Sequence, residues 1–144
     1  MASKLDPDLV RHAYIAKNAP SEHEIGWLGH KRFKGDEKHV QIKFDPSDPE
    51  IQDKFTYHTH PADEPTPLTA LPSEQDLIAA AMATDVGLRG IVIFSGNFYT
   101  VIVPTERVKG GHFKQYIDCL SRGDIEDAIK ELEKAGFDVE TGKL

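Results

Sequence analysis

The chain has 144 residues, a length that suits one domain with one hydrophobic core. A composition of 39% hydrophobic and 28% charged residues is typical of a globular protein and excludes a disordered or fibrous one. The net charge of −7, without a run of lysines and arginines, argues against a nucleic-acid-binding surface. No stretch reaches the roughly 20 apolar residues of a membrane helix, so no membrane association is expected.

The N-terminal sequence and the cysteine content both bear on the cellular compartment. The N-terminal sequence MASKLDPDLV lacks the apolar core of a signal peptide. The single cysteine, Cys119, excludes an internal disulfide. Both observations indicate the cytoplasm.

The first third of the chain predicts a helix and two strands. Residues 6–18 are expected to be helical, because an Asp-Pro pair supplies an N-cap and a first helical residue ahead of an apolar stripe. Residues 24–33 are predicted to form the first strand. Residues 39–44, HVQIKF, alternate with period two and predict a second strand that forms a hairpin with the first. Residues 45–53 form a turn-rich acidic linker.

The middle of the chain predicts a strand, a loop and a helix. Residues 55–60, FTYHTH, are rich in aromatic and β-branched residues and predict a strand. Pro61 ends it, because proline has no N–H to donate to a neighbouring strand. After a proline-rich loop, a helix is predicted from Ser73 to about Thr84, and Gly87 suits its end.

The last third predicts a hairpin, a helical pair and an edge strand. Residues 89–94 and 97–103 are strongly β and flank a Ser-Gly turn; the wholly apolar GIVIF suits a central strand covered on both faces. Helices are predicted at residues 113–120 and 124–135, and the tail from Phe137 suits an edge strand. The fold class is therefore α/β: a single domain, residues 1–144, with a mixed sheet of about five or six strands flanked by helices.

Two histidines on the predicted strand are candidate metal ligands. His58 and His60 are two residues apart, so on a strand their side chains point to the same face. Ser73 and Asp76 are three residues apart in the first turn of the next helix and share a face that could look back at the strand end. Two histidines and one carboxylate match a catalytic zinc site, which commonly keeps an open position for water.

A structural interpretation of the same residues stays open beside the metal site. Ser-x-x-Asp after a proline is also a helix N-cap signature, with Ser73 as the cap and Asp76 near the positive helix end. Capping and catalysis are compatible for Ser73. Two other sites built on His-x-His are excluded: the metallo-β-lactamase type needs a further Asp-His, and zinc deaminases need a Cys pair that this chain lacks.

The sequence HTHP, a loop and SEQD together resemble the JAMM motif of the JAB/MPN metalloproteases, over roughly residues 8–105. The resemblance implies a curved mixed sheet with helices and one zinc ion on His58, His60 and Asp76. It also implies an upstream catalytic glutamate, which we expect to be Glu24 in SEHEIGWLG, with Glu22 as the alternative. One departure is visible: the loop of residues 62–72 is longer than is usual in the family.

The resemblance implies a zinc-dependent hydrolase of peptide or isopeptide bonds, whose substrate is a protein or peptide, including a conjugate of a ubiquitin-like protein. Glu24 would take a proton from water and deliver it to the leaving amine, and Ser73 would stabilise the oxyanion. The regions that carry large substrate-shaping insertions in eukaryotic relatives are short here, as in compact prokaryotic or viral members.

Two alternative functions stay open. The first is a catalytically silent binding or assembly module of the same fold, although the complete set of candidate residues argues against it. The second is hydrolysis of a small amide conjugate of a carrier protein, which the sequence does not separate from isopeptide hydrolysis.

Overall fold

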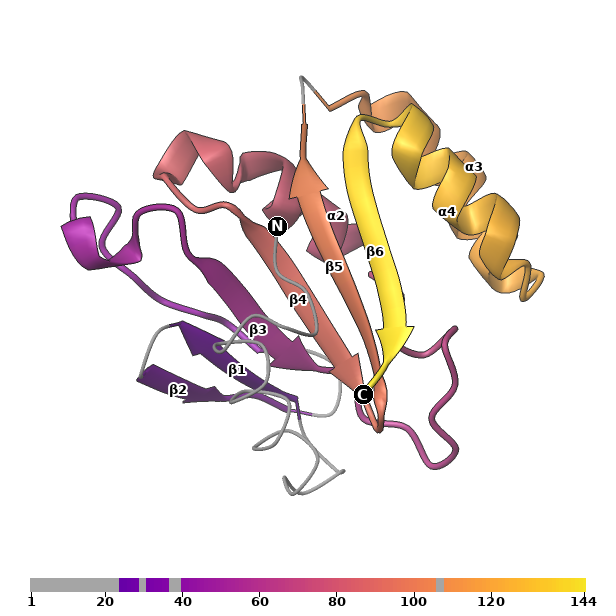
Figure 1. The fold of residues 1–144 in the computed structure, drawn as a ribbon, viewed down its shortest axis with the longest axis horizontal. Helices are drawn as coiled ribbons and strands as arrows, with labels where there is room; N and C mark the ends of the chain where they lie inside the picture. Colours follow the sequence, from indigo (N-terminus) through magenta and orange to yellow (C-terminus); the bar gives the residue numbers. More distant parts are fainter. Residues whose placement is uncertain (1–23, 29–30, 37–39, 106–107) are drawn as a thin grey trace.

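The computed structural model describes residues 24–28, 31–36, 40–105 and 108–144. In this part of the chain, one mixed sheet has six strands in the order β2-β1-β3-β4-β5-β6 (Figure 1). Strands β3 and β4 are parallel, and every other neighbouring pair is antiparallel. The strands are β1 (Ile25–Leu28), β2 (Lys31–Lys34), β3 (Phe55–Thr59), β4 (Gly90–Ser95), β5 (Phe98–Pro104) and β6 (Phe137–Lys143).

Three α-helices of the described residues pack on one face of this sheet. Helix α2 connects the parallel strands β3 and β4, and α3 and α4 form an antiparallel pair beside the edge strand β6 (Figure 1). Short 3-10 turns lie at Pro49–Ile51, Thr84–Val86 and Gly110–His112. The helices are α2 (Glu74–Met82), α3 (Phe113–Ser121) and α4 (Ile125–Lys134).

The period-two alternation of the central strands divides the core between the two faces of the sheet. On the helix face, Ile91 and Ile93 of β4 pack with side chains of all three helices, including Leu77 of α2 and Leu132 of α4. On the opposite face lies a second cluster, which contains Ile25, Trp27, Phe55, Tyr57, Val92, Phe94, Tyr99 and Val101. Strand β4 is buried at every position, as expected for a central strand covered on both sides.

Most of the predicted elements are confirmed. The strand at residues 55–60, the helix capped by Ser73, the hairpin around Gly96 and the two C-terminal helices all form within a residue or two of the predicted bounds. Gly96 has a φ of 57° and Gly87 a φ of 85°, the left-handed conformations that favour glycine in a turn and after a helical turn. The tail forms β6, at the edge of the sheet.

Two predictions in the N-terminal part are wrong. Residues 24–33 do not form one strand, because β1 and β2 pair with each other and the chain reverses between Leu28 and Lys31. The charged β2 suits the exposed edge of the sheet. Residues 40–44 are not a strand: their burial alternates, but no ladder forms, and β1 already pairs with β2 and β3. The helix predicted at residues 6–18 lies outside the described residues.

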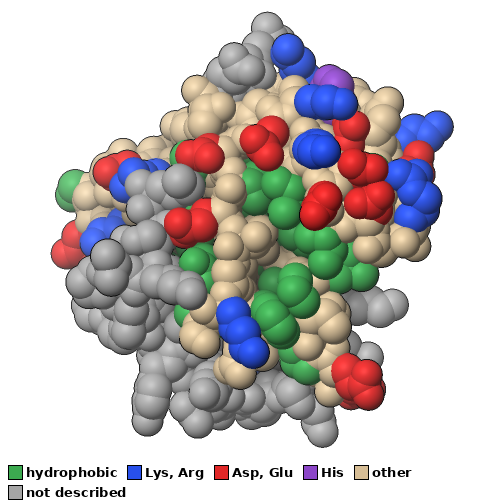
Figure 2. All heavy atoms as spheres, turned by 45° about the vertical axis from the view of Figure 1, so that its right-hand side comes forward, with side chains coloured by type: hydrophobic (Ala, Val, Ile, Leu, Met, Phe, Trp, Pro, Cys, Tyr) green, Lys and Arg blue, Asp and Glu red, His purple; other side chains and the backbone are tan. Residues whose placement is uncertain are grey.

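The sequence predicts neither a membrane helix nor a basic nucleic-acid-binding surface, and the described residues can be compared with both expectations. None of the helices in the described part of the chain has the length and hydrophobicity that crossing a membrane requires. On the face drawn in Figure 2, the described Lys and Arg side chains are interspersed with Asp and Glu side chains instead of forming one basic surface.

Tyr116 of α3 is tied to the chain just before α2. Its side chain is fully buried, and its hydroxyl donates a 2.6 Å hydrogen bond to the carbonyl oxygen of Pro72. Pro72 directly precedes Ser73, the N-cap of α2. The contact therefore fixes where α2 begins relative to α3.

We predict that Tyr116→Phe lowers the free energy of unfolding by about 1–3 kcal/mol, because it leaves the Pro72 carbonyl buried without its donor. Urea denaturation of the wild type and the variant measures the difference. A loss below about 0.5 kcal/mol would show that this contact does not stabilise the fold.

Candidate metal centre

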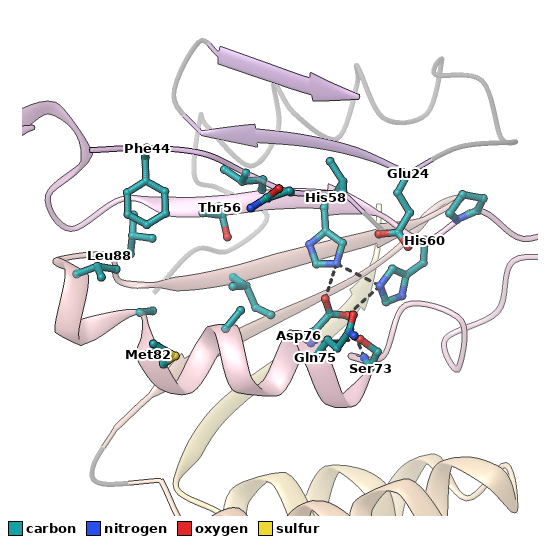
Figure 3. Close-up of a pocket in the computed structure, with 18 of the residues that line it drawn as sticks. Glu24, Phe44, Thr56, His58, His60, Ser73, Gln75, Asp76, Met82 and Leu88 are labelled. Atoms are coloured by element: carbon teal, nitrogen blue, oxygen red, sulfur yellow. Dashed lines mark hydrogen bonds and ion pairs between the residues drawn. The ribbon is translucent and has the colours of Figure 1, made fainter. Parts of the chain in front are cut away.

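The two histidines lie where β3 ends, on the helix face of the sheet. His58 is paired in register with Gly26 of β1 and Ile93 of β4, so its side chain shares the face of Ile93. His60 follows the strand, and its backbone N–H donates a 2.7 Å hydrogen bond to the carbonyl of Phe94. Their imidazole rings meet edge to face with 4.9 Å between centroids (Figure 3). The predicted common orientation is confirmed.

Ser73 and Asp76 form a complete capping box at the start of α2. The Ser73 hydroxyl oxygen accepts the backbone N–H of Asp76 at 3.2 Å, and the Asp76 carboxylate accepts the backbone N–H of Ser73 at 2.9 Å. The capping interpretation of Ser-x-x-Asp is therefore confirmed. It does not compete with the metal site, because the same carboxylate also faces both histidines (Figure 3).

The three predicted ligands converge within the dimensions of a metal site. His58 Nε2 lies 3.1 Å from Asp76 Oδ1, and His60 Nε2 lies 3.0 Å from Asp76 Oδ2. The two Nε2 atoms are 3.1 Å apart. Two nitrogens bound tetrahedrally to one zinc ion at about 2.0–2.1 Å are about 3.3 Å apart, so the donor set fits zinc closely.

Proton accounting at His60 is compatible with a shared cation. The His60 Nδ1 atom lies 3.1 Å from the carbonyl oxygen of Thr69, a contact in which only the nitrogen can donate. In neutral His60, Nε2 is then a bare lone pair that faces the Asp76 carboxylate and the Nε2 of His58. Protons on the two Nε2 atoms can satisfy this arrangement, because each would donate to its own oxygen of Asp76. One metal ion bound by all three groups would satisfy it as well.

Glu24 completes the cluster from the other side. It immediately precedes β1, is only 6% exposed, and has its backbone fixed by hydrogen bonds to Asp36 and Gly35. Ligand atoms of Glu24, His58 and His60 lie within 4.8 Å of one another, close enough to bind a metal ion. The structure thus brings Glu24 together with the two histidines. The alternative, Glu22, lies outside the described residues.

The electrostatics of the cluster separate its two carboxyl groups. Burial and the nearby charges of Asp76 and Asp36 raise the pKa of Glu24 to about 7, although His60 opposes the shift. Burial alone would also raise the pKa of Asp76, but the charge and hydrogen bond of His58 and the hydrogen bond of His60 hold it well below its usual range. Asp76 is therefore a permanent anion, and Glu24 can exchange a proton near neutral pH.

His60 carries the complementary shift. Burial alone would lower the pKa of His60, but the hydrogen bond and charge of Asp76 and the charge of Glu24 raise it. The site is therefore an anionic environment that stabilises a cation at the position of the His60 imidazole.

The metal centre lies at one end of a cavity of about 670 Å³. Glu24, His58, His60, Ser73 and Asp76 line one end, and Phe44, Met82 and Leu88 lie at the other (Figure 3). Between them the lining is mostly apolar. The remaining lining residues are Val40, Gln41, Ile42, Thr56, Pro61, Thr69, Gln75, Ala79, Ala83, Val86 and Ile91.

The sequence missed two parts of this site. Thr69 contacts His60 through its backbone carbonyl, which no side-chain pattern reveals. The wall formed by Val40, Ile42 and Phe44 was indicated by the alternation of residues 39–44, but that alternation was assigned to a strand.

Comparison with known proteins adds no assignment: no family model, no curated protein and no solved structure matches this chain.

We predict that metal-free protein loses stability through Glu24 as the pH rises. The folded state keeps the Glu24 proton up to about pH 7, whereas the unfolded chain releases it near its ordinary pKa of 4.5. Stability relative to Glu24→Gln should therefore fall by about 3 kcal/mol between pH 4.5 and pH 7.5. Urea unfolding in the presence of a chelator measures this difference.

The control for this prediction is Glu133→Gln, which changes an exposed glutamate of α4. Its stability relative to the wild type should be nearly independent of pH over the same range. Parallel pH profiles of the wild type and Glu24→Gln would contradict the raised pKa of Glu24.

Proposed function

We propose that this protein is a zinc-dependent hydrolase of peptide or isopeptide bonds, of the JAMM type. The observation that carries the proposal is the convergence of His58, His60 and Asp76, with 3.0–3.1 Å between their facing ligand atoms, beside the buried carboxyl of Glu24. These are the residue types, in the same chain order, that the resemblance in the sequence implies.

His58, His60 and Asp76 would hold the metal ion through two neutral imidazoles and one carboxylate. Zinc bound by three protein ligands lowers the pKa of a coordinated water to about 7 and polarises the carbonyl that the water attacks. The neutral form of His60 that binding needs is the one whose Nδ1–H donates to Thr69.

Glu24 suits the proton transfers of the reaction. A general base works best when its pKa lies near the working pH, and burial raises the pKa of Glu24 to about 7. Its carboxylate would accept a proton from the attacking water and then, as the acid, deliver it to the leaving amine.

Ser73 suits the stabilisation of the oxyanion. Its oxygen already accepts the Asp76 backbone N–H, which fixes the side chain, while a serine hydroxyl retains its proton for a second hydrogen bond. Ser73 also lies at the positive end of α2, where a developing negative charge is favoured.

The cavity supports a substrate larger than a small amide. It follows α2 from Ser73 to Met82, which corresponds to about 14 Å at 1.5 Å per residue. An extended segment of about four residues would fit along this length. A peptide or the C-terminal tail of a protein, including a ubiquitin-like protein, is therefore the substrate class that we propose.

We predict about one zinc ion per chain in purified protein, measured by elemental analysis. His58→Ala and Asp76→Ala should lose it, because each removes one of three ligands. Glu24→Gln should keep the zinc and lose hydrolysis, since an amide cannot carry the proton. Glu22→Gln is its matched control and should keep both properties.

Three results would contradict this assignment. Full zinc content in His58→Ala or Asp76→Ala would reject the ligands. Loss of zinc in Glu24→Gln would make Glu24 a ligand and not the base. If wild-type protein binds no zinc even after zinc is added, the hydrolase proposal is rejected. The remaining interpretation is a binding module in which Ser73 and Asp76 only cap the helix.

A second prediction concerns the apolar end of the cavity. Met82→Glu should lower kcat/KM by about tenfold for peptide amides of four or more residues, through KM, because it places a charge on the apolar lining. Ile78→Glu is the matched control: Ile78 of α2 is 47% exposed, Met82 is 55% exposed, and Ile78 does not line the cavity.

The readout is steady-state hydrolysis of peptide amides of two to six residues. Equal effects of both substitutions would reject this part of the cavity as the binding surface. Equal hydrolysis of the shortest and longest amides would favour a small conjugate as the substrate.

A further inference from the structure

The loop between β3 and α2 contacts the metal centre at a defined point. The carbonyl oxygen of Thr69 accepts a hydrogen bond from His60 Nδ1 at 3.1 Å. Thr69 itself also lines the cavity. The loop of residues 62–72 is longer than is usual in the family that the sequence resembles. The contact with His60 suggests a function for part of this additional length.

The side chain of Thr69 is fixed by a saturated set of hydrogen bonds. Its hydroxyl donates to the carbonyl of Thr66 at 2.9 Å and accepts the Thr66 backbone N–H at 3.0 Å. A third contact, 2.7 Å long, joins it to the hydroxyl of Ser95. Either hydroxyl can donate in this contact, and with the Thr69 proton directed at the carbonyl of Thr66, Ser95 is the donor.

Ser95 anchors this loop to the sheet. It is the last residue of β4 and is only 1% exposed. Its neighbour Phe94 accepts the backbone N–H of His60 at 2.7 Å. The same end of β4 therefore holds both parts of His60. Phe94 binds its backbone N–H directly, and Ser95 contacts Thr69, whose carbonyl binds the His60 ring.

The turn after β4 provides a second contact for the loop. A Cβ atom added to Gly96 would lie 2.6 Å from the Cβ of Pro65, so the loop packs directly on the glycine. The loop thus lies against the end of β4 at Ser95 and at Gly96. A rigid support of this kind can set the position of a carbonyl group.

We propose that Thr69 and Ser95 are positioning residues for the metal ligand His60: their hydroxyl pair holds the Thr69 carbonyl where it fixes the ring and tautomer of His60. The inference rests on the proposed zinc site. The loop would thereby influence metal affinity, although neither Thr69 nor Ser95 would contact the metal.

The physical reason is the tautomer of the imidazole. A histidine binds a metal through Nε2 only when the proton resides on Nδ1, and a fixed acceptor at Nδ1 selects that form before binding. Partners of this kind typically change metal affinity by about 10–100-fold when they are removed. Thr69 and Ser95 act through one link, so their effects should not add.

The test measures zinc dissociation constants by competition with a chromogenic chelator. Thr69→Val and Ser95→Ala should each bind zinc at least tenfold more weakly than the wild type, and the double variant no more weakly than the worse single one. Thr69→Ser, which keeps the hydroxyl, should restore affinity to within about threefold. Thr105→Val, the same chemical change at a hydroxyl that donates to Gly136 and does not line the cavity, should also stay within threefold.

A spectroscopic readout separates positioning from general destabilisation. Nitrogen-15 NMR of metal-free protein at alkaline pH, where His60 is neutral, should show His60 mainly as the Nδ1–H tautomer in the wild type and Thr105→Val, and as a mixture in Thr69→Val and Ser95→Ala. A loss of affinity without a change in the tautomer would overturn the proposal.

The outcomes distinguish this proposal from the proposed function. If the wild type binds zinc, and the zinc dissociation constants of Thr69→Val and Ser95→Ala are both within threefold of the wild-type value, positioning by the hydroxyl pair is rejected. The proposed zinc site is then unaffected. If the wild type binds no zinc, the proposed function fails, and this inference fails with it.

Discussion

The carboxylate of Asp76 is the group on which the helix start and the metal centre both depend. One oxygen accepts the Ser73 N–H and faces His60, while the other faces His58. The same side chain therefore caps α2, provides negative charge to two imidazoles and would supply a ligand atom to the proposed metal ion. Because the cap fixes the carboxylate before any ion binds, the geometry of the site follows from the local structure of the helix.

The sheet determines where this carboxylate finds its partners. Strands β3 and β4 are parallel with α2 as their connection, so the carboxyl end of β3 and the start of α2 are close in sequence and in space. Two buried contacts hold the intervening chain: Ser95 contacts Thr69, and Tyr116 contacts Pro72. The loop thus reaches α2 in a defined position, with the positive helix end directed at the site.

The sequence could predict the parts of the site that depend on local geometry. The spacing of His58 and His60 gives a common strand face, and that of Ser73 and Asp76 gives the capping box; both are present. Their meeting depends on the β3–β4 pairing, which no local pattern specifies. The two failures have related causes. Residues 24–33 contain no proline and no Asn-Gly or Asp-Gly pair, so the sequence does not indicate where the chain reverses. Alternation reports side-chain faces without backbone pairing, so the pattern of residues 39–44 predicts a strand that does not form.

The most direct test of the metal centre is X-ray absorption at the zinc edge of zinc-loaded protein. We expect two imidazole ligands and further light-atom ligands at about 2.0–2.1 Å, with no sulfur. A sulfur ligand would implicate Cys119, and zinc with a single imidazole would indicate an adventitious ion. Either result would contradict a site built from His58, His60 and Asp76.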